Sequence, residues 1–243
     1  MEDDHTKSDR KLVYLTDLGL VDYKTAWDRQ QDVFDHSVAI KLARKTNPSL
    51  DPPKNRLFLC EHPHVYTLGK SGSEKNLLLQ LNELFTRSID FYRNNRGGDI
   101  TYHGPGQIVG YPIIDLDQFS ADIKIYMRSL EEIMIRTIAE YGLSGDRVDG
   151  ATGVWLDVGR PAERKICAFG VKTSRWVTMH GWALNVNTDL SYFNYIVPCG
   201  IADKGVTSLQ QELGKEINME EVKGKILKHF EDVFETEIIK RNA

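Results

Sequence analysis

A cysteine and a lysine in the C-terminal half of the chain have the residue types of a nucleophilic site. Cys199 lies between a proline and a glycine in the segment 197–201, and Lys165 lies 34 residues before it. A thiol with a pKa of about 8.5 is mostly protonated at neutral pH, and a nearby ammonium lowers that pKa and favours the reactive thiolate. The proline restricts one backbone angle, and the glycine permits a sharp turn or a close approach of substrate. The pattern makes Cys199 a candidate nucleophile and Lys165 its cationic partner.

Two other interpretations of these residues stay open. Cys167 is a rival nucleophile because it is the cysteine closer to Lys165 along the chain. Strand alternation would project Lys165, Cys167 and Phe169 to the same side. A lysine directed inward has a lowered pKa and can act as a base or thiolate partner, whereas a lysine at a strand edge keeps its charge in water. Cys199 itself can be a small buried apolar residue, so the thiols alone do not decide the chemistry.

The segment 96–107 carries the strongest local signature of ligand binding. It contains four glycines, which leave backbone amides open to close approach by a ligand. Arg96 offers a fork of donors, and Tyr102 and His103 have the chemistry to line a pocket. The segment is not a phosphate-binding loop, since no Gly-Lys-Ser/Thr follows, and it lacks the third glycine of a dinucleotide site. The alternative is a surface loop whose glycines only form turns.

Four histidines, His62, His64, His103 and His180, raise the question of metal binding. Their spacings match no zinc pattern, and the chain has no Cys-x-x-Cys pair, so we expect no metal site. A cysteine protease site with His103 or His180 as the base is a further alternative, although nothing nearby resembles a protease signature.

The composition is that of an ordinary globular enzyme. The chain has 243 residues, a formal net charge of −4 and three cysteines. The acidic balance argues against a nucleic-acid partner, and no apolar run is long enough to span a membrane. An odd number of cysteines and a charged N-terminus without an apolar region predict a cytoplasmic protein without a disulfide framework. We expect a polar N-terminal tail over 1–10 and one catalytic domain over 11–243.

The periodicity of apolar residues predicts three helices and six strands. The helices are expected over 23–45, 121–141 and 219–236, the last with Asn218 as its N-cap. The strands are expected over 11–15, 56–60, 108–114, 153–157, 165–172 and 177–186. The segment 61–69 contains too many polar and turn residues to be expected as a buried element. Helices interspersed with strands and hairpins predict a single α/β (α+β) domain with a mixed β-sheet flanked by helices.

Six segments, taken together, resemble the lipoyl(octanoyl) transferase family. They are 61–69, 96–107, 152–155, 165–171, 180–185 and 196–201, which follow in order within residues 55–210. The resemblance implies the fold of biotin and lipoate protein ligases, with Cys199 carrying the acyl group and Lys165 lowering its pKa. It implies these substrate-binding residues: Arg96, Gly97, Gly98, Asp99, Ile100, Thr101, Tyr102, His103, Ala168, Phe169, Gly170, His180, Gly181, Trp182 and Ala183. Tyr102, Phe169 and Trp182 are the expected tunnel walls.

Three positions depart from the family's usual residues. Asp99 stands where many members have glutamine, Cys167 where alanine is frequent, and Trp182 where phenylalanine or a smaller apolar residue is frequent. These departures bear on the detail of the pocket rather than on Cys199 and Lys165.

The resemblance also implies a reaction and its partners. The expected activity moves an octanoyl group from octanoyl-acyl carrier protein, through a cysteine thioester, to a lysine of an apo lipoyl domain. The expected acceptors are the 2-oxoacid dehydrogenase complexes and the glycine cleavage H protein. No cofactor is expected, because conversion of a thioester to an amide is downhill, and the protein is expected to be a monomer. The alternatives are an ATP-dependent lipoate or biotin ligase of the same fold, and a non-catalytic carrier-binding protein.

Overall fold

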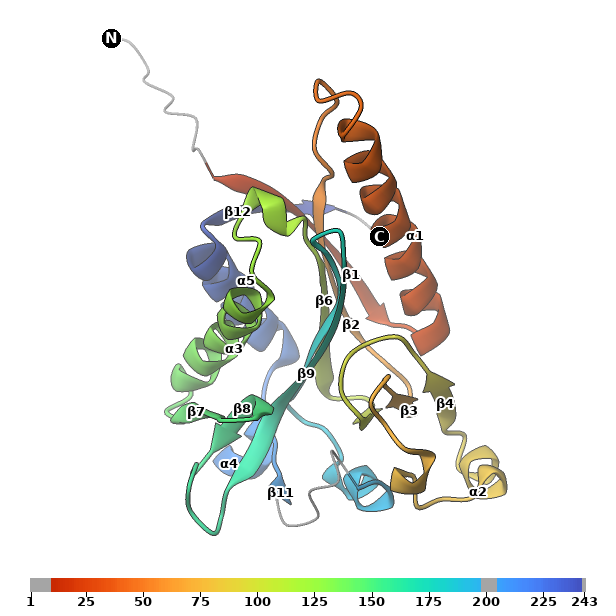
Figure 1. Cartoon of the computed structure of the whole chain (residues 1–243). Helices are drawn as coiled ribbons and strands as arrows, with labels where there is room; N and C mark the ends of the chain where they lie inside the picture. The colour runs from red at the N-terminus through yellow and green to blue at the C-terminus, as the bar shows by residue number, and fades with distance from the viewer. Residues whose placement is uncertain (1–9, 198–204, 242–243) are drawn as a thin grey trace.

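A long mixed sheet and a small second sheet organise the protein, which a computed structural model describes over residues 10–197 and 205–241 (Figure 1). The large sheet has nine strands in the order β12-β1-β2-β6-β10-β9-β8-β7, with β11 beside β9. Its strands are β1 (Lys11–Leu20), β2 (Asn55–Glu61), β6 (Gln107–Ile113), β7 (Gly145–Val148), β8 (Ala151–Leu156), β9 (Arg164–Ser174), β10 (Val177–Asn185), β11 (Gly205–Val206) and β12 (Thr236–Arg241). The small sheet, in the order β4-β3-β5, consists of β3 (Val65–Leu68), β4 (Asp90–Arg93) and β5 (Ile100–His103).

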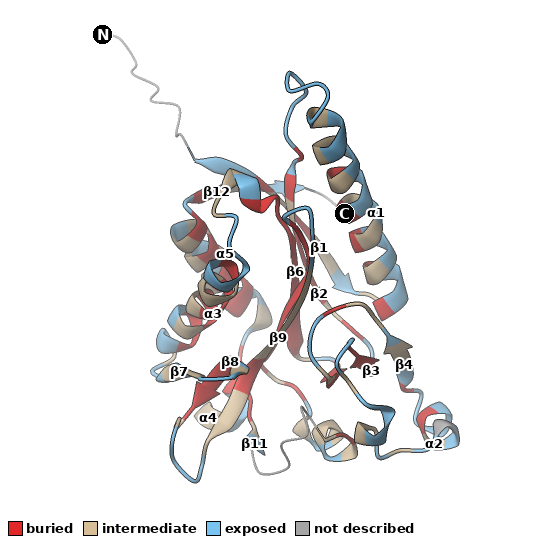
Figure 2. Cartoon of the chain, in the orientation of Figure 1, coloured by how far each residue is buried: buried red, intermediate tan, exposed pale blue. Residues whose placement is uncertain are grey.

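Helices cover both faces of the large sheet (Figure 1). The helices are α1 (Tyr23–Arg44), α2 (Leu81–Thr86), α3 (Ile123–Ala139), α4 (Leu209–Leu213) and α5 (Met219–Phe234), and short 3₁₀ turns occupy Glu74–Asn76, Leu116–Gln118 and Leu190–Tyr195. One core packs residues of α3 and α5, such as Leu130 and Phe230, against the sheet. A second core joins α1, through residues such as Phe34, to the opposite face. Figure 2 shows the buried residues of these helices turned toward the sheet.

Strand directions make the sheet mixed, as the sequence predicts. β1 runs parallel to both β2 and β12, whereas β2–β6, β6–β10, β10–β9, β9–β8 and β8–β7 are antiparallel pairs. The parallel connection from β1 to β2 passes through α1, as such crossovers require a long link. The predicted fold class, a single α/β domain with a mixed sheet between helices, is therefore confirmed.

The three predicted helices are confirmed with ends shifted by at most two residues at each terminus. Their N-caps explain where they begin. The Asp22 carboxylate accepts a hydrogen bond from Thr25 N at 2.8 Å, and the Asn218 side chain accepts from the backbone amides of Glu220 and Glu221. α5 ends at Phe234, and the residue that caps it, Glu235, has a left-handed conformation with φ of 52°. Within residues 10–197 and 205–241, no helix has both the length and the apolar character to cross a membrane.

The expectation that 61–69 is not a buried element is wrong. β3 lies in this segment and is buried along its whole length, and His62 before it is also buried. Its polar groups find partners inside the protein: the Tyr66 hydroxyl donates to Tyr192 O at 2.7 Å, and Thr67 accepts two hydrogen bonds from Arg96. Buried polar side chains cost little when they are hydrogen-bonded, so composition alone underestimates burial here. The strands β4, β5, β7, β11 and β12 were likewise not predicted, since each is short or polar.

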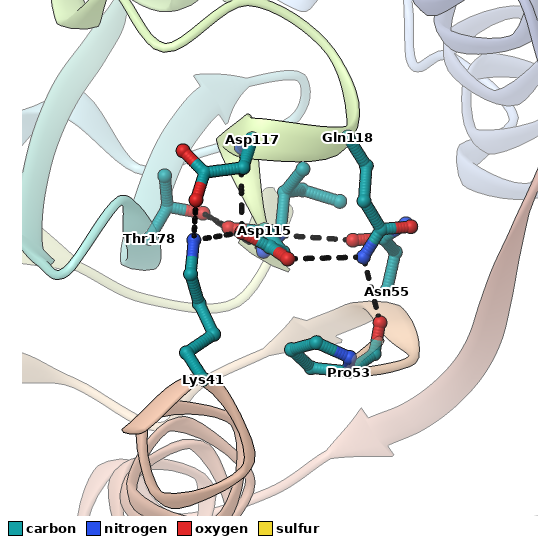
Figure 3. Close-up of polar contacts among 8 residues, drawn as sticks. Lys41, Pro53, Asn55, Asp115, Asp117, Gln118 and Thr178 are labelled. Atoms are coloured by element: carbon teal, nitrogen blue, oxygen red, sulfur yellow. Dashed lines mark hydrogen bonds and ion pairs between the residues drawn. The ribbon is translucent and has the colours of Figure 1, made fainter. Parts of the chain in front are cut away.

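An internal ion pair ties the C-terminal end of α1 to the segment that follows β6 (Figure 3). The Lys41 ammonium contacts the carboxylates of Asp115 and Asp117, the latter at 2.6 Å. The side chains of Lys41 and Asp115 are only 11% and 5% exposed. Asn55 at the start of β2 accepts from Asp115 N at 2.9 Å, and Gln118 donates to Asp115 at 3.2 Å. This network joins α1, β2 and the loop after β6 at one end of the sheet.

We expect Lys41→Met to lower the free energy of unfolding by about 3 kcal/mol, because it leaves the buried Asp115 carboxylate without its cation. Urea denaturation of the two proteins measures the loss. The matched control is Lys24→Met, whose partner Asp28 is exposed; this substitution should cost less than about 1 kcal/mol. Equal losses for the two variants would contradict a stabilising role for the Lys41 network.

Candidate active site

A cavity of about 500 Å³ gathers most of the residues that the sequence singles out for binding. The predicted residues that line it are Lys165, Arg96, Gly97, Gly98, Asp99, Ile100, Thr101, His103, Ala168, Phe169, Gly170, His180, Gly181, Trp182 and Ala183. They come from the segment before β5, from β5 itself, and from β9 and β10. Apolar and aromatic walls with a few polar groups are typical of a small-molecule site.

Among the described residues, one predicted site residue is not part of this lining. Tyr102 is buried on the other side of β5, where its ring stacks on Tyr192 with centroids 4.9 Å apart and its hydroxyl lies 2.7 Å from His64 Nδ1. Strand alternation separates it from Thr101 and His103, so the expectation that Tyr102 forms a tunnel wall is corrected. Cys199 lies outside the residues that the structure describes.

A glycine pair lets neighbouring backbone segments approach the cavity closely. Gly170 of β9 and Gly181 of β10 are directly opposite each other. A Cβ atom on Gly181 would lie 2.2 Å from Gly110 O, and one on Gly170 would lie 2.9 Å from Arg96 Cδ. A side chain at Gly181 would therefore push β6 away from β10, and one at Gly170 would push the Arg96 segment away from β9.

The glycines between β5 and β6 have a different role. Gly106 has a φ of 79°, which favours glycine, and its amide donates to the Glu61 carboxylate at 2.8 Å. A Cβ on Gly104 would lie 1.9 Å from the Tyr102 hydroxyl. These two glycines serve the turn and its packing, as the alternative interpretation of the segment proposed.

The Arg96 guanidinium forms hydrogen bonds within the protein. The side chain is buried, and it donates to Thr67 O at 2.7 Å, to Thr67 Oγ1 at 3.0 Å and to Gly97 O at 3.0 Å. These bonds hold the 96–98 backbone against β3. Arg96 therefore shapes the cavity wall and places a cation near it.

Asp99 anchors the other side of the same loop. Its carboxylate accepts from Ile100 N at 2.7 Å and from Ser73 N at 3.2 Å, and Asn76 also donates to it. The carboxylate thereby joins the 96–100 segment to the turn at 73–76. A glutamine, which the resemblance would lead one to expect at this position, has one acceptor oxygen in place of the carboxylate's two.

The cavity histidines are neutral at physiological pH. Burial lowers the pKa of His103 to about 3 and that of His180 to about 3, with the Arg96 cation adding to both effects. Each ring is already bonded: His103 Nδ1 lies 2.8 Å from Gln107 Oε1, and His180 Nε2 lies 2.8 Å from Asn95 Oδ1. A base paired with a thiol needs a pKa much nearer the working pH, so neither histidine has the properties of such a base.

Lys165 lies on the cavity wall at an irregularity in the sheet. Val154 pairs with Cys167, but the next residue, Trp155, pairs with Lys165, so β9 has an extra residue, Ile166. This bulge places the Lys165 Nζ 4.5 Å from the centroid of the Trp155 ring. It also breaks the alternation that was expected to put Lys165 and Cys167 on the same side.

Cys167 does not have the properties of the rival nucleophile. Its side chain is fully buried in the core under α3, and burial raises the pKa of the thiol well above its usual value. A thiol in such surroundings stays protonated and unreactive. Within the described residues, Lys165 lines the cavity and Cys167 belongs to the core.

Several lining residues were not predicted from the sequence. They are Tyr23, Gln107, Val109, Tyr111, Met127, Gly150, Ala151, Thr152, Trp155, Val171, Asn185, Phe193, Gly205 and Val206. The segment 152–155 overlaps a predicted strand and is one of the segments of the resemblance, and that resemblance was the available signal for its place in the site. Its position beside Lys165 follows from strand pairing. Tyr23 begins α1, and nothing local in the sequence indicates that this helix end reaches the cavity.

Solved structures with the same fold include lipoate protein ligases. A bi-partite lipoate protein ligase from Thermoplasma acidophilum aligns with a TM-score of 0.68 and 16% sequence identity, covering 96% of this chain and 87% of that chain. A lipoate-protein ligase A crystallised with ATP also aligns with a TM-score of 0.68, at 15% identity, covering 96% of this chain and 89% of the other. At these identities the likeness shows the fold alone.

Sequence relatives are much closer. An octanoyltransferase of Christiangramia forsetii is 58% identical over 229 residues, which cover 94% of this chain and 98% of the relative. One of Flavobacterium johnsoniae is 57% identical over 230 residues, covering 94% and 99%. The family described as the lipoyl protein ligase A/B catalytic domain matches residues 22–231. The chain therefore belongs to the lipoyl protein ligase A/B catalytic family and, within it, to the octanoyltransferases.

Proposed function

We propose that this protein transfers an octanoyl group from octanoyl-acyl carrier protein to a lysine of an apo lipoyl domain, through a thioester on Cys199. The observation that carries the proposal is the largely apolar cavity with Lys165 on its wall, in a chain 58% identical to an octanoyltransferase. The acceptors we propose are the lipoyl domains of 2-oxoacid dehydrogenase complexes and the glycine cleavage H protein. We propose that it works as a monomer in the cytoplasm, without a cofactor.

In the first half-reaction, the Cys199 thiolate attacks the carbonyl carbon of the carrier's thioester. The new carbon–sulfur bond forms as the bond to the carrier's sulfur breaks. The carrier leaves as a thiolate that takes up one proton from the Lys165 ammonium, which thereby becomes a neutral amine. The Lys165 ammonium stabilises the Cys199 thiolate before the attack. The described chain resumes at Gly205, six residues after Cys199, where β11 pairs with β9 at Arg164 and Lys165. The proposal requires Cys199 to lie within reach of Lys165, and the pairing of β11 with β9 is compatible with this requirement.

In the second half-reaction, the neutral amine of the lipoyl-domain lysine attacks the enzyme thioester. The amide bond forms, the bond to the Cys199 sulfur breaks, and one proton of the attacking amine passes to Lys165, which has by then become a neutral amine. The apolar walls bind the alkyl chain, and each buried methylene contributes about 0.8 kcal/mol. When the alkyl chain is bound in the cavity, the thioester carbonyl is oriented toward Lys165.

The runner-up function is an ATP-dependent lipoate or biotin ligase. The shared fold with the ATP-bound lipoate-protein ligase A motivates this alternative. A ligase activates a free acid with ATP, whereas a transferase starts from an acyl group already activated as a thioester. The two functions therefore differ in their need for a nucleotide.

The acyl-enzyme should be visible directly. Incubation with octanoyl-loaded acyl carrier protein should add one octanoyl mass to the intact chain, and peptide mapping should locate it at Cys199. Cys199→Ser should abolish this thioester adduct. The matched controls, Cys167→Ala and Cys60→Ala, should keep it, since both thiols are buried. An adduct on Cys167 would reject Cys199 as the nucleophile.

Lys165→Ala should raise the pKa of the Cys199 thiol and slow acylation by roughly two powers of ten. Loss of a cation beside a thiolate in a shielded site costs roughly 3 kcal/mol, and each ~1.4 kcal/mol is a factor of ten. The pH dependence of iodoacetamide alkylation at Cys199 measures the change, and its midpoint should move to higher pH. Lys172→Ala, on the same strand, is the control. An unchanged midpoint in Lys165→Ala would leave the lysine a structural role only.

Initial rates should be independent of ATP and should follow ping-pong kinetics, because the acyl-enzyme stores the activated group. Plots of reciprocal rate against reciprocal acceptor concentration, at several donor concentrations, should be parallel. Intersecting plots together with an ATP requirement would support the ligase instead.

A further inference from the structure

Trp155 and Lys165 form a cross-strand pair that regular pairing of β8 with β9 would not produce. The bulge at Ile166 brings the two side chains opposite each other, and the lysine Nζ lies 4.5 Å from the indole centroid. The Trp155 ring is buried, and its Nε1 donates to Ala151 O at 3.2 Å, which fixes the plane of the ring. A buried aromatic face at this distance attracts an ammonium through the quadrupole of the ring.

Gly153 supplies the space for this pair. It has a φ of 149°, and a Cβ atom there would lie 2.9 Å from Trp155 Nε1 and 3.0 Å from Lys165 Cε. Its amide donates to the buried Glu131 carboxylate of α3 at 3.2 Å. The Gly153 backbone is therefore held by Glu131 of α3. Because Gly153 has no side chain, the side chains of Trp155 and Lys165 can both pack close to it.

Glu131 and Arg164, two described charged residues near the pair, are bonded to other residues. Glu131 accepts from Arg128 at 2.8 Å and from Arg147 of β7 at 3.2 Å. Arg164, next to Lys165 on β9, pairs with Asp157 and Glu212, each at 2.5 Å. These carboxylates are thus engaged with arginines, and the indole face is an additional group that favours the ammonium form of the lysine.

We propose that Trp155 is a positioning residue for Lys165: its indole face holds the ammonium on the cavity wall and favours the charged form. The inference rests on the proposed function for its catalytic consequence, because the thiolate of Cys199 would be stabilised by the cation that Trp155 holds in place. Trp155 touches the lysine and acts through it. The remaining aromatic residues of the cavity are proposed only as walls.

The placement can be tested by NMR on the full chain labelled with ¹³Cε-lysine. The Lys165 signal is assigned by its loss in Lys165→Arg. In the unaltered protein its Hε resonance should be shifted upfield by the ring current of Trp155. Trp155→Leu should remove this shift and lower the pKa of the Lys165 amine by ~0.4–1.5 pH units. Trp155→Phe should give intermediate values, and Trp176→Leu, at an exposed tryptophan outside the cavity, should change neither.

The catalytic consequence is measured in the same variants. The octanoylation rate at neutral pH should fall ~2- to 30-fold in Trp155→Leu and less in Trp155→Phe. If the Lys165 Hε resonance of the unaltered protein lies at the usual position for a lysine, Trp155 does not hold the lysine against its ring. This measurement does not depend on the folding of a variant. The same Lys165 pKa in Trp155→Leu and in the unaltered protein would overturn the electrostatic role. Absence of an octanoyl adduct in the unaltered protein would instead reject the proposed function, whatever the NMR result.

Discussion

Gly170 and Gly181 lie opposite each other in the pairing of β9 with β10, and this register controls which side chains face the cavity. A slip of one residue would turn every side chain of a strand to the other face of the sheet. Both faces of this hairpin are covered, by the α3–α5 core on one side and the α1 core on the other. Each apolar side chain moved out of a core costs about 1.5–3 kcal/mol, so the two cores together hold the register and the site with it.

A chain of hydrogen bonds between buried polar side chains links the opposite walls of the cavity. His103 of β5 bonds to Gln107 of β6, Gln107 donates to Asn185 of β10 at 2.8 Å, and Asn185 donates to Thr207 O at 3.0 Å. Thr207 follows β11, and its amide donates to Lys165 O at 2.9 Å. Satisfied networks of this kind make a buried site rigid, whereas an unpaired member would be costly. The network thus connects the small sheet to the strand that carries Lys165.

Ligases and transferases share this architecture, so the fold does not choose between them. The choice depends on how the carbonyl of the acyl group is activated and on which group bears the charge beside it. In the described part of the cavity the histidines are neutral, whereas Lys165 and the buried Arg96 are the basic residues of the lining. A cation next to an apolar chamber suits a thiolate nucleophile and an activated acyl donor. The indole of Trp155 adds to this arrangement through a group that carries no charge of its own.

Local pattern was sufficient for the helices, for the strands with apolar runs and for the sequence segments that line the cavity. The periodicity of α1, α3 and α5 follows from the need to bury one face, and the 96–107, 165–171 and 180–185 blocks carry their chemistry in residue type and order. The sequence by itself therefore determined the fold class, the family and most of the candidate binding residues.

Other features depended on contacts between distant segments. The burial of His62 and β3 depends on partners from Val21, Tyr111 and Arg96, which no local window contains. β5, whose alternation puts Thr101 and Tyr102 on opposite sides, forms by pairing with β3, and the opposite sides taken by Lys165 and Cys167 depend on a bulge in β9. Only the tertiary structure decided that Lys165 faces the cavity beside Trp155 and that Cys167 lies in the core, because a one-residue irregularity reverses the alternation that sequence reasoning assumes.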